Sequence, residues 1–150
     1  MANNKVNEQQ PIAFHLAIPV NDIANTRDFY INQLGCRIGR ESERWIDFDF
    51  FGHQLSAHVK PEETHLSQTN LVDGEQVPVR HFGLVLEWNR WHQFVDQLNA
   101  QDVNYLIKPT IRFHGKTGEQ ATFFIQDPSG NALEFKSFKL SGQLFAKEGN

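Results

Sequence analysis

Two histidines and one glutamate of this sequence have side chains that bind metal ions, and the histidines open two similar strings. His15 begins HLAIPV, His81 begins HFGLVL, and Glu134 lies within GNALEFKS near the end of the chain. Two imidazoles and one carboxylate leave coordination positions open, which is the ligand set of many non-haem Fe(II) oxygenases and also suits Mn(II). Open positions matter because substrate or dioxygen must reach the ion. The pattern predicts one catalytic metal ion held by these three residues.

Ser56 occupies the matching position in the first half of the chain. The string GHQLSAHV aligns with GNALEFKS, so that Ser56 corresponds to Glu134. A two-fold relation between the halves would bring the two histidines, Ser56 and Glu134 around one point. A serine hydroxyl is a poor metal ligand beside imidazole and carboxylate, so we expect Ser56 to contact substrate instead.

The elements that position these residues repeat along the chain. Residues 14–35 and 81–102 each show strand alternation followed by a helix, which begins at Asn21-Asp22 in the first copy and is capped by Asn89 in the second. In the second helix an apolar stripe recurs at helical spacing, formed by Trp91, Phe94, Val95 and Leu98.

Strand-like stretches follow each helix, and a turn signal precedes the last of them. In the first half they cover residues 36–42, 44–51 and 53–59, and in the second half residues 103–113, 121–127 and 131–138. Each half is therefore predicted to fold as a βαβββ module, in an α+β protein of one domain. Module one spans about 12–59, a polar linker about 60–79 and module two about 80–138, with polar tails at both ends.

Strand alternation predicts a polar cavity between the modules. Side chains of a strand alternate between its two faces. In the first and last strand of each half, one face is apolar and suited to pack under a helix, while the other carries small or polar groups. We expect the four polar faces to enclose the metal site.

Three further histidines are candidates for proton transfer. His58 shares a face with Ser56 and could serve as a fourth ligand or as a general base, since imidazole titrates near neutral pH; a passive cavity wall is the alternative. His114 lies beside the long loop of the second half and could also move protons. Which face of its strand His53 occupies depends on the geometry of the turn before it. If His53 lies on the same face as Leu55, its role is structural.

Two further side chains are candidates for substrate binding. Trp45 shares one face of a central strand with Asp47 and Asp49 and could stack on a planar substrate, or simply pack. Arg112 could pair with a substrate carboxylate through its planar guanidinium, or lie at the surface.

Composition argues against several other classes of protein. The formal net charge is −4 and no Lys/Arg cluster occurs, which disfavours a nucleic-acid partner. The single cysteine, Cys36, excludes an intramolecular disulfide and suits a reducing cytoplasm. No apolar run reaches the ~20 residues that span a membrane, and the start MANNKVNEQQ lacks the apolar stretch of a signal peptide. Dinucleotide, phosphate-loop, nucleophile-elbow and paired-cysteine motifs are absent.

Over residues 12–138 the chain resembles the vicinal oxygen chelate superfamily, which includes glyoxalases, bleomycin-resistance proteins and extradiol dioxygenases. The strings that carry the resemblance are HLAIPVNDIANTRDFYINQLG, HFGLVLEW and DPSGNALEFKSF. The strings WIDFDFFGHQLSAH and GEQATFFIQDPSGNALEF look most like a bacterial group described as predicted dioxygenases of the extradiol type.

The resemblance implies paired βαβββ modules in an open, U-shaped mixed sheet around a metal ion, with ligands at His15, His81 and Glu134. Glyoxalase I-type lyases use a fourth ligand, usually Glu, where this chain has Ser56, so the three-ligand arrangement of extradiol dioxygenases and fosfomycin-modifying transferases is favoured. The resemblance also implies a homodimer.

The first functional hypothesis is a ring-cleaving oxidoreductase that uses Fe(II) on a small catechol-like or vicinal-oxygen substrate. The second is a glyoxalase I-like lyase or isomerase, or a related transferase, that uses Mn, Ni, Zn or Co. The third is a metal-free protein that binds small molecules. Neither a nucleic acid nor a membrane is an expected partner.

Overall fold

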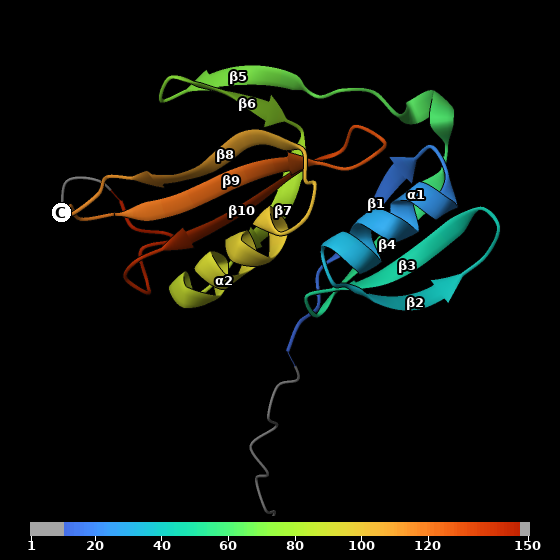
Figure 1. The fold of residues 1–150 in the computed structure, drawn as a ribbon, viewed down its shortest axis with the longest axis horizontal. Coiled ribbons are helices and arrows are strands. Elements are labelled where there is room, and N and C mark those ends of the chain that lie inside the picture. The colour runs from blue at the N-terminus through green and yellow to red at the C-terminus, as the bar shows by residue number, and fades with distance from the viewer. Residues whose placement is uncertain (1–10, 148–150) are drawn as a thin grey trace, which may run out of the picture.

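The computed structural model describes residues 11–147, and most of the predicted N-terminal tail lies outside that range. Two modules with the same order of elements follow each other along the chain (Figure 1). Module one contains β1 (His15–Val20), α1 (Ile23–Arg27), the π-helical turn η1 (Asp28–Gln33), β2 (Arg37–Glu41), β3 (Trp45–Phe50) and β4 (His53–Val59). Module two contains β7 (His81–Val85), α2 (Trp88–Asn99), β8 (Tyr105–Arg112), β9 (Gln120–Gln126) and β10 (Ala132–Phe138). The predicted α+β class and the repeated βαβββ order are confirmed.

Each module forms one four-stranded sheet with the same topology. The orders are β1-β4-β3-β2 and β7-β10-β9-β8, and in both the first strand runs parallel to its neighbour while the other pairs are antiparallel. Ser56 lies opposite Ala17, two residues after His15, and Glu134 lies opposite Gly83, two residues after His81. The register therefore gives Ser56 and Glu134 equivalent positions in their modules.

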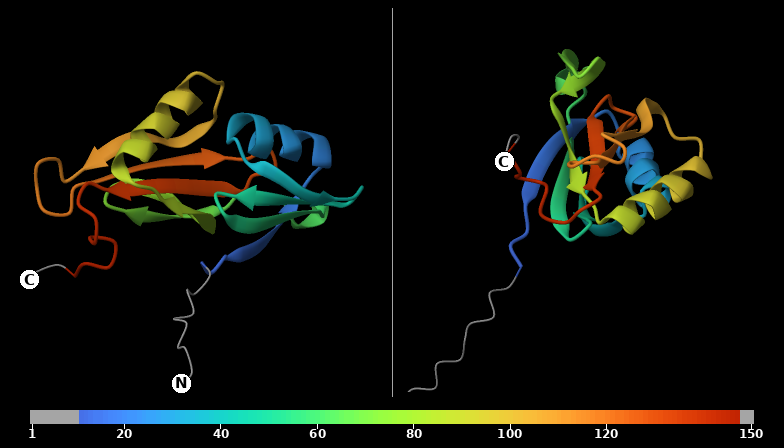
Figure 2. Two further views of the ribbon diagram at one scale, coloured as in Figure 1. Left: turned by 90° about the horizontal axis from the view of Figure 1, so that it is seen from below. Right: turned by 90° about the vertical axis from the view of Figure 1, so that its left-hand side faces the viewer.

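Both helices lie on one side of the two sheets (Figure 2). The apolar strand faces pack beneath them, and buried residues of both modules form a single hydrophobic cluster. The buried Tyr30 hydroxyl donates to the Asp127 carboxylate of module two at 2.8 Å, and the Phe51 and Phe94 rings meet across the modules with centroids 5.7 Å apart. The modules thus share one core on the helix side of their sheets.

The helix caps follow the predicted chemistry with one correction. The Asp22 side chain accepts from the Asn25 backbone N–H and caps α1, as expected for a helix starting at Asn21-Asp22. In α2 the cap is Glu87 rather than Asn89, because the Glu87 carboxylate accepts from the Asn89 and Arg90 backbone N–H groups. Asn89 therefore lies inside the first turn.

The stretch predicted as a plain linker contains ordered elements. A 3-10 turn, η2 (Pro61–Glu63), is followed by a hairpin of β5 (Gln68–Val72) and β6 (Glu75–Val79). The turn residues Asp73 and Gly74 both have φ in the left-handed region, as short hairpin turns require. The sequence signal for this hairpin is the Asp-Gly pair between two short runs of alternating apolar and polar residues.

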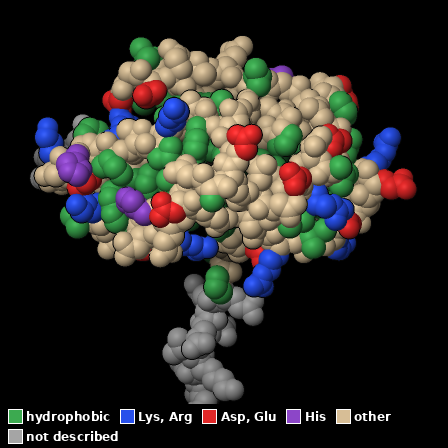
Figure 3. All heavy atoms as spheres, in the orientation of Figure 1, with side chains coloured by type: hydrophobic (Ala, Val, Ile, Leu, Met, Phe, Trp, Pro, Cys, Tyr) green, Lys and Arg blue, Asp and Glu red, His purple; other side chains and the backbone are tan. Residues whose placement is uncertain are grey.

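The surface mixes charges of both signs. On the face shown in Figure 3, basic and acidic side chains are interspersed. Among the described residues, no helix combines the length and the apolar character needed to cross a membrane.

Candidate metal centre

His81 and Glu134 meet on the polar face of the second sheet. The strand β7 that begins with His81 pairs with β10, and Glu134 lies two residues along β10 from the residue opposite His81. The His81 Nε2 atom is 3.1 Å from the Glu134 Oε2 atom, and the two side chains are partly buried, with 29% and 16% of their surface exposed.

A hydrogen bond on the far side of each side chain fixes its orientation. The His81 Nδ1 atom is 2.6 Å from the Pro78 carbonyl oxygen, and since a carbonyl only accepts, Nδ1 carries the proton and donates. The Glu134 Oε1 atom accepts from the Thr122 hydroxyl at 3.0 Å. Partners of this kind orient metal-binding side chains in proteins and set the histidine tautomer. They leave Nε2 and Oε2 directed at one place.

The distance between these two atoms fits neighbouring ligands of one divalent ion. Nitrogen and oxygen ligands lie about 2.0–2.2 Å from such an ion, so two of them at right angles are about 3 Å apart. The observed separation of 3.1 Å matches this value. The side chains could therefore hold an ion between them with little rearrangement.

The electrostatics of the pair favour a charged carboxylate. Burial raises the pKa of Glu134, but the hydrogen bond from His81, the charge of Lys136 and the hydrogen bond from Thr122 outweigh it, and the pKa lies below its ordinary value. The hydrogen bond to Glu134 raises the pKa of His81, and burial opposes this only in part. The 3.1 Å separation is also that of a hydrogen bond between the two groups when no ion lies between them.

A cavity of about 500 Å³ opens beside the pair. Its apolar walls come from Ile107, Phe124 and the hairpin residues Val72 and Val77, and the Phe124 ring packs edge-on against the His81 imidazole with centroids 5.1 Å apart. This volume is in the range of small-molecule sites.

Two cations also line this cavity. Arg112, the predicted partner of a substrate carboxylate, is ion-paired with Asp73 of the hairpin. Lys136 was not among the predicted site residues, although its position two residues after Glu134 signals the same strand face. Thr122 was likewise missed, because only the sheet register reveals its position beside Glu134.

His15 does not join His81 and Glu134 within one chain. Its side chain is exposed on β1, and among residues 11–147 no three His, Cys, Asp or Glu side chains gather as a metal-binding group. Within one chain the structure does not bring His15 to His81 and Glu134, and the three-residue ligand set stays a prediction. The two modules lie side by side (Figure 1). They share a core under their helices, so the polar face of each sheet is the one turned away from the helices.

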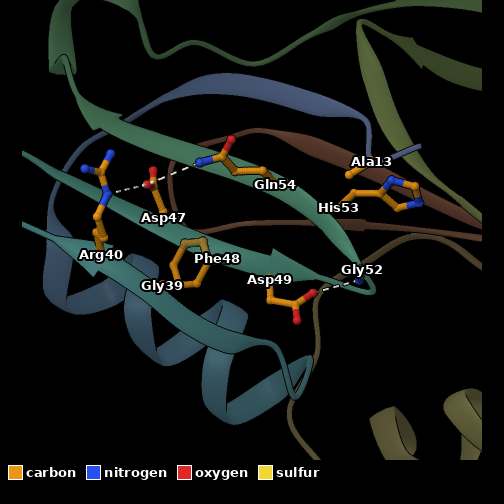
Figure 4. Close-up of a pocket in the computed structure, with 9 residues that line it drawn as sticks. All are labelled: Ala13, Gly39, Arg40, Asp47, Phe48, Asp49, Gly52, His53 and Gln54. Carbon is orange, nitrogen blue, oxygen red and sulfur yellow. Dashed lines mark hydrogen bonds and ion pairs between the residues drawn. The ribbon is translucent and has the colours of Figure 1, made fainter. Parts of the chain in front are cut away.

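On the polar face of module one, Ser56 belongs to a hydrogen-bonded group around Asp47. The Ser56 hydroxyl donates to the Asp47 Oδ1 atom at 2.6 Å, while Arg40 lies 3.9 Å from the Asp47 Oδ2 atom. Asp47 is 8% exposed and, with Gln54, lines a cavity of about 360 Å³ (Figure 4). The predicted substrate contact at Ser56 thus lies beside a buried carboxylate.

Trp45 and His58 lie opposite each other on this same face. Strand pairing places Trp45 against His58, with Trp45 half-buried and His58 exposed. The Arg40 guanidinium stacks over the Trp45 ring, 5.4 Å from its centroid. Both remain on the outward face of module one.

His53 and His114 lie outside the His81 cavity. The His53 Nδ1 atom accepts from the Phe14 backbone N–H at 2.9 Å, a structural contact that holds the start of β1. The His114 side chain is 84% exposed and its Nδ1 atom is 3.1 Å from Glu119, which Lys139 also contacts. His114 is not among the residues that line the cavity beside Glu134.

Comparisons with known proteins agree with this architecture. A sequence profile of the family described as Glyoxalase/Bleomycin resistance protein/Dioxygenase superfamily matches residues 12–135. No curated protein matches the chain.

Several solved structures resemble the whole chain. A glyoxalase/bleomycin resistance protein/dioxygenase from Alicyclobacillus acidocaldarius is 30% identical, with a TM-score of 0.75 over 89% of this chain and 96% of that one. The fosfomycin resistance protein FosX from Listeria monocytogenes shares the fold at 14% identity, with a TM-score of 0.66 over 90% and 99% of the two chains. A lactoylglutathione lyase from Agrobacterium tumefaciens shares it at 14% identity, with a TM-score of 0.59 over 93% and 100%.

Proposed function

Because this chain belongs to the glyoxalase/bleomycin resistance protein/dioxygenase superfamily, we propose that it is a metal-dependent enzyme whose metal site is completed by a second copy of the chain. His81 and Glu134 of one chain would hold the ion together with His15 of the other. The observation that carries this proposal is the 3.1 Å approach of two ligand atoms, each oriented by its own outer hydrogen bond.

The edges of the sheets support the contribution of a second copy. Among the described residues β1 pairs only with β4, and β7 pairs only with β10, so each leaves one edge unpaired. Phe14 just before β1 and Val85 at the end of β7 are 63% and 42% exposed, and an apolar groove of about 180 Å³ lies between these strands. Exposed apolar edges invite pairing with another chain. A two-fold dimer would cover both edges and create two equivalent sites.

The chain's own residues would orient the ligands and shield the site. Pro78 and Thr122 keep the His81 and Glu134 ligand atoms pointed at the ion, and Phe124 and Ile107 limit water on that side. The ion, when bound, would supply a Lewis acid for adjacent oxygens of the substrate.

From module one, His58 would hold or move a proton near the bound substrate. Its imidazole is exposed on the polar face that the second copy would turn toward the cavity. The surface position of His114 gives that residue no comparable support.

Ring cleavage of the extradiol type is the reaction that the ligand set favours. Two histidines and one carboxylate leave positions open for an oxygen-rich substrate, and Ser56 stands where a lyase of the glyoxalase I type has its fourth ligand. Anaerobically Fe(II)-loaded protein is expected to turn catechols into coloured ring-fission products. A glutathione hemithioacetal assay tests the lyase reaction as the alternative.

A complementation experiment tests the shared metal site. The variants His15→Ala and Glu134→Ala are purified separately, and each is expected to lose most bound metal, because two remaining ligands hold a divalent ion poorly. After the two variants are mixed, unfolded and refolded together, a heterodimer contains one site with all three ligands. Metal analysis of the isolated heterodimer, tagged differently on each chain, is expected to return one ion per dimer.

Three other results would contradict the proposal. A heterodimer without metal would show that His15 of the second chain is not a ligand. Full metal binding by His15→Ala alone would exclude it from the ligand set. A wild-type protein that binds no divalent metal after purification without chelators would favour a metal-free small-molecule-binding protein.

A further inference from the structure

We propose that Lys136 makes the cavity beside His81 and Glu134 selective for small monoanions, with a carboxylate attached to an apolar body. This inference rests on the proposed function, because it takes that cavity as the substrate site.

Lys136 stands at the wall of the cavity next to the candidate metal ligands. It lies on β10 two residues after Glu134, so strand alternation places both side chains on the same face. Thr122, which hydrogen-bonds to Glu134, lies opposite Lys136 in the sheet. The side chain is half-buried and lines the same cavity of about 500 Å³.

Among the charges around the cavity, Lys136 is the cation that a ligand can use. Arg112 is ion-paired with Asp73 of the hairpin, whereas Lys136 has no ion-pair partner within 4.0 Å among the described residues. The remaining acidic group, Glu75, is exposed on the hairpin. With a divalent ion bound and His81 neutral, the charges that line the cavity add up to +1, which one carboxylate neutralises.

The other walls set the rest of the ligand. Val72, Val77, Ile107 and Phe124 line the cavity with apolar surface, so the part of the ligand that lies against them would be small and apolar. A second copy would add the polar face of its module one to the cavity. On that face Arg40 is paired with the buried Asp47, so their charges offset each other. A lysine presents one point charge, while recognition of a doubly charged phosphonate usually uses arginine forks. The cavity therefore favours a monoanion.

Binding of three matched probes tests this inference. Dissociation constants of benzoate, neutral benzamide and phenylphosphonate are measured by calorimetry on the wild type, Lys136→Met and Arg112→Met. The metal content of each preparation is determined, and the measurements are repeated on metal-free protein. Methionine keeps the length and apolar stem of the side chain, and Arg112→Met is the control for loss of a cation from the same cavity.

The wild type is expected to bind benzoate about tenfold more tightly than benzamide, as one charge-assisted hydrogen bond provides. Lys136→Met is expected to lose this tenfold preference, while its dissociation constant for benzamide stays within about twofold of the wild-type value. Arg112→Met is expected to keep the preference for benzoate. The loss in Lys136→Met is expected in metal-loaded protein, whereas without the ion the same charges add up to −1 and the benzoate preference of the wild type is expected to shrink.

Two results would overturn the inference. The first is a benzoate preference that Lys136→Met leaves unchanged. The second is tighter binding of phenylphosphonate than of benzoate, together with its loss in Arg112→Met. If either result is found in protein that binds metal normally, only the role of Lys136 is refuted, and the proposed function stands. Failure of metal binding instead refutes the proposed function.

Discussion

Replacement of Gly83 by alanine tests whether the close approach of β7 to β10 holds the candidate metal ligands together. A Cβ atom at Gly83 would lie 1.6 Å from the Glu134 carbonyl oxygen. Carbon–oxygen contacts between strands are normally about 3.3 Å or longer, so the backbones would have to separate by about 1.7 Å. The strain therefore falls directly on the segment that carries Glu134.

The expected cost follows from the hydrogen bonds that such a shift would break. The β7–β10 pairing spans five residue pairs, and Gly83–Glu134 is the central one. Loss of two or three ladder hydrogen bonds, each contributing about 1 kcal/mol, predicts a fall of about 2–3 kcal/mol in the free energy of unfolding. Because Glu134 also moves relative to His81, metal affinity is expected to fall at least about tenfold.

Gly39→Ala is the matched control. Gly39 also lies in a strand, but a Cβ atom there would stop 3.2 Å from the nearest atoms of Asp47, which a small shift of exposed β2 can relieve. Urea unfolding and competitive metal titration are measured on both variants. Equal stability losses in the two variants, or a Gly83→Ala protein with wild-type metal affinity, would refute the reasoning.

Further predictions concern the buried polar groups of the core. Tyr30→Phe removes the donor to the buried Asp127 carboxylate and is expected to lower the free energy of unfolding by about 1–2 kcal/mol in urea titrations; an unchanged value would show that the contact does not join the modules energetically. Burial, then the nearby Asp127, raises the pKa of Tyr30 well above its ordinary value of about 10. Its stabilising contribution is present below pH 10 and declines above it, so between pH 10 and 11 the wild type should lose up to about 1.4 kcal/mol more stability than Tyr30→Phe, and parallel curves would contradict this. Ser137 has a buried hydroxyl with no hydrogen-bond partner among the described residues, so Ser137→Ala is expected to raise the unfolding free energy by up to about 1 kcal/mol in the same titrations, and a loss of that size would count against it.

Much of the module architecture could be predicted from local patterns. Alternation along the strands identified the apolar and polar faces, and the aligned strings gave Ser56 the position in module one that Glu134 has in module two, as the register shows. The hairpin between the modules also has a local cause in its Asp-Gly turn, but the polar composition of that stretch predicts a plain linker, and the structure corrects this prediction.

The arrangement of the two modules needed the tertiary structure. Strand alternation determines which face of a sheet a side chain occupies, so the sequence alone was enough to put His15, His81 and Glu134 on polar faces. Strand alternation carries no information about how one sheet lies against another. That arrangement depends on contacts between distant residues, such as Tyr30 with Asp127 and Phe51 with Phe94, and these turn the polar faces outward. Only such packing decided that His81 and Glu134 meet within one chain while His15 lies apart.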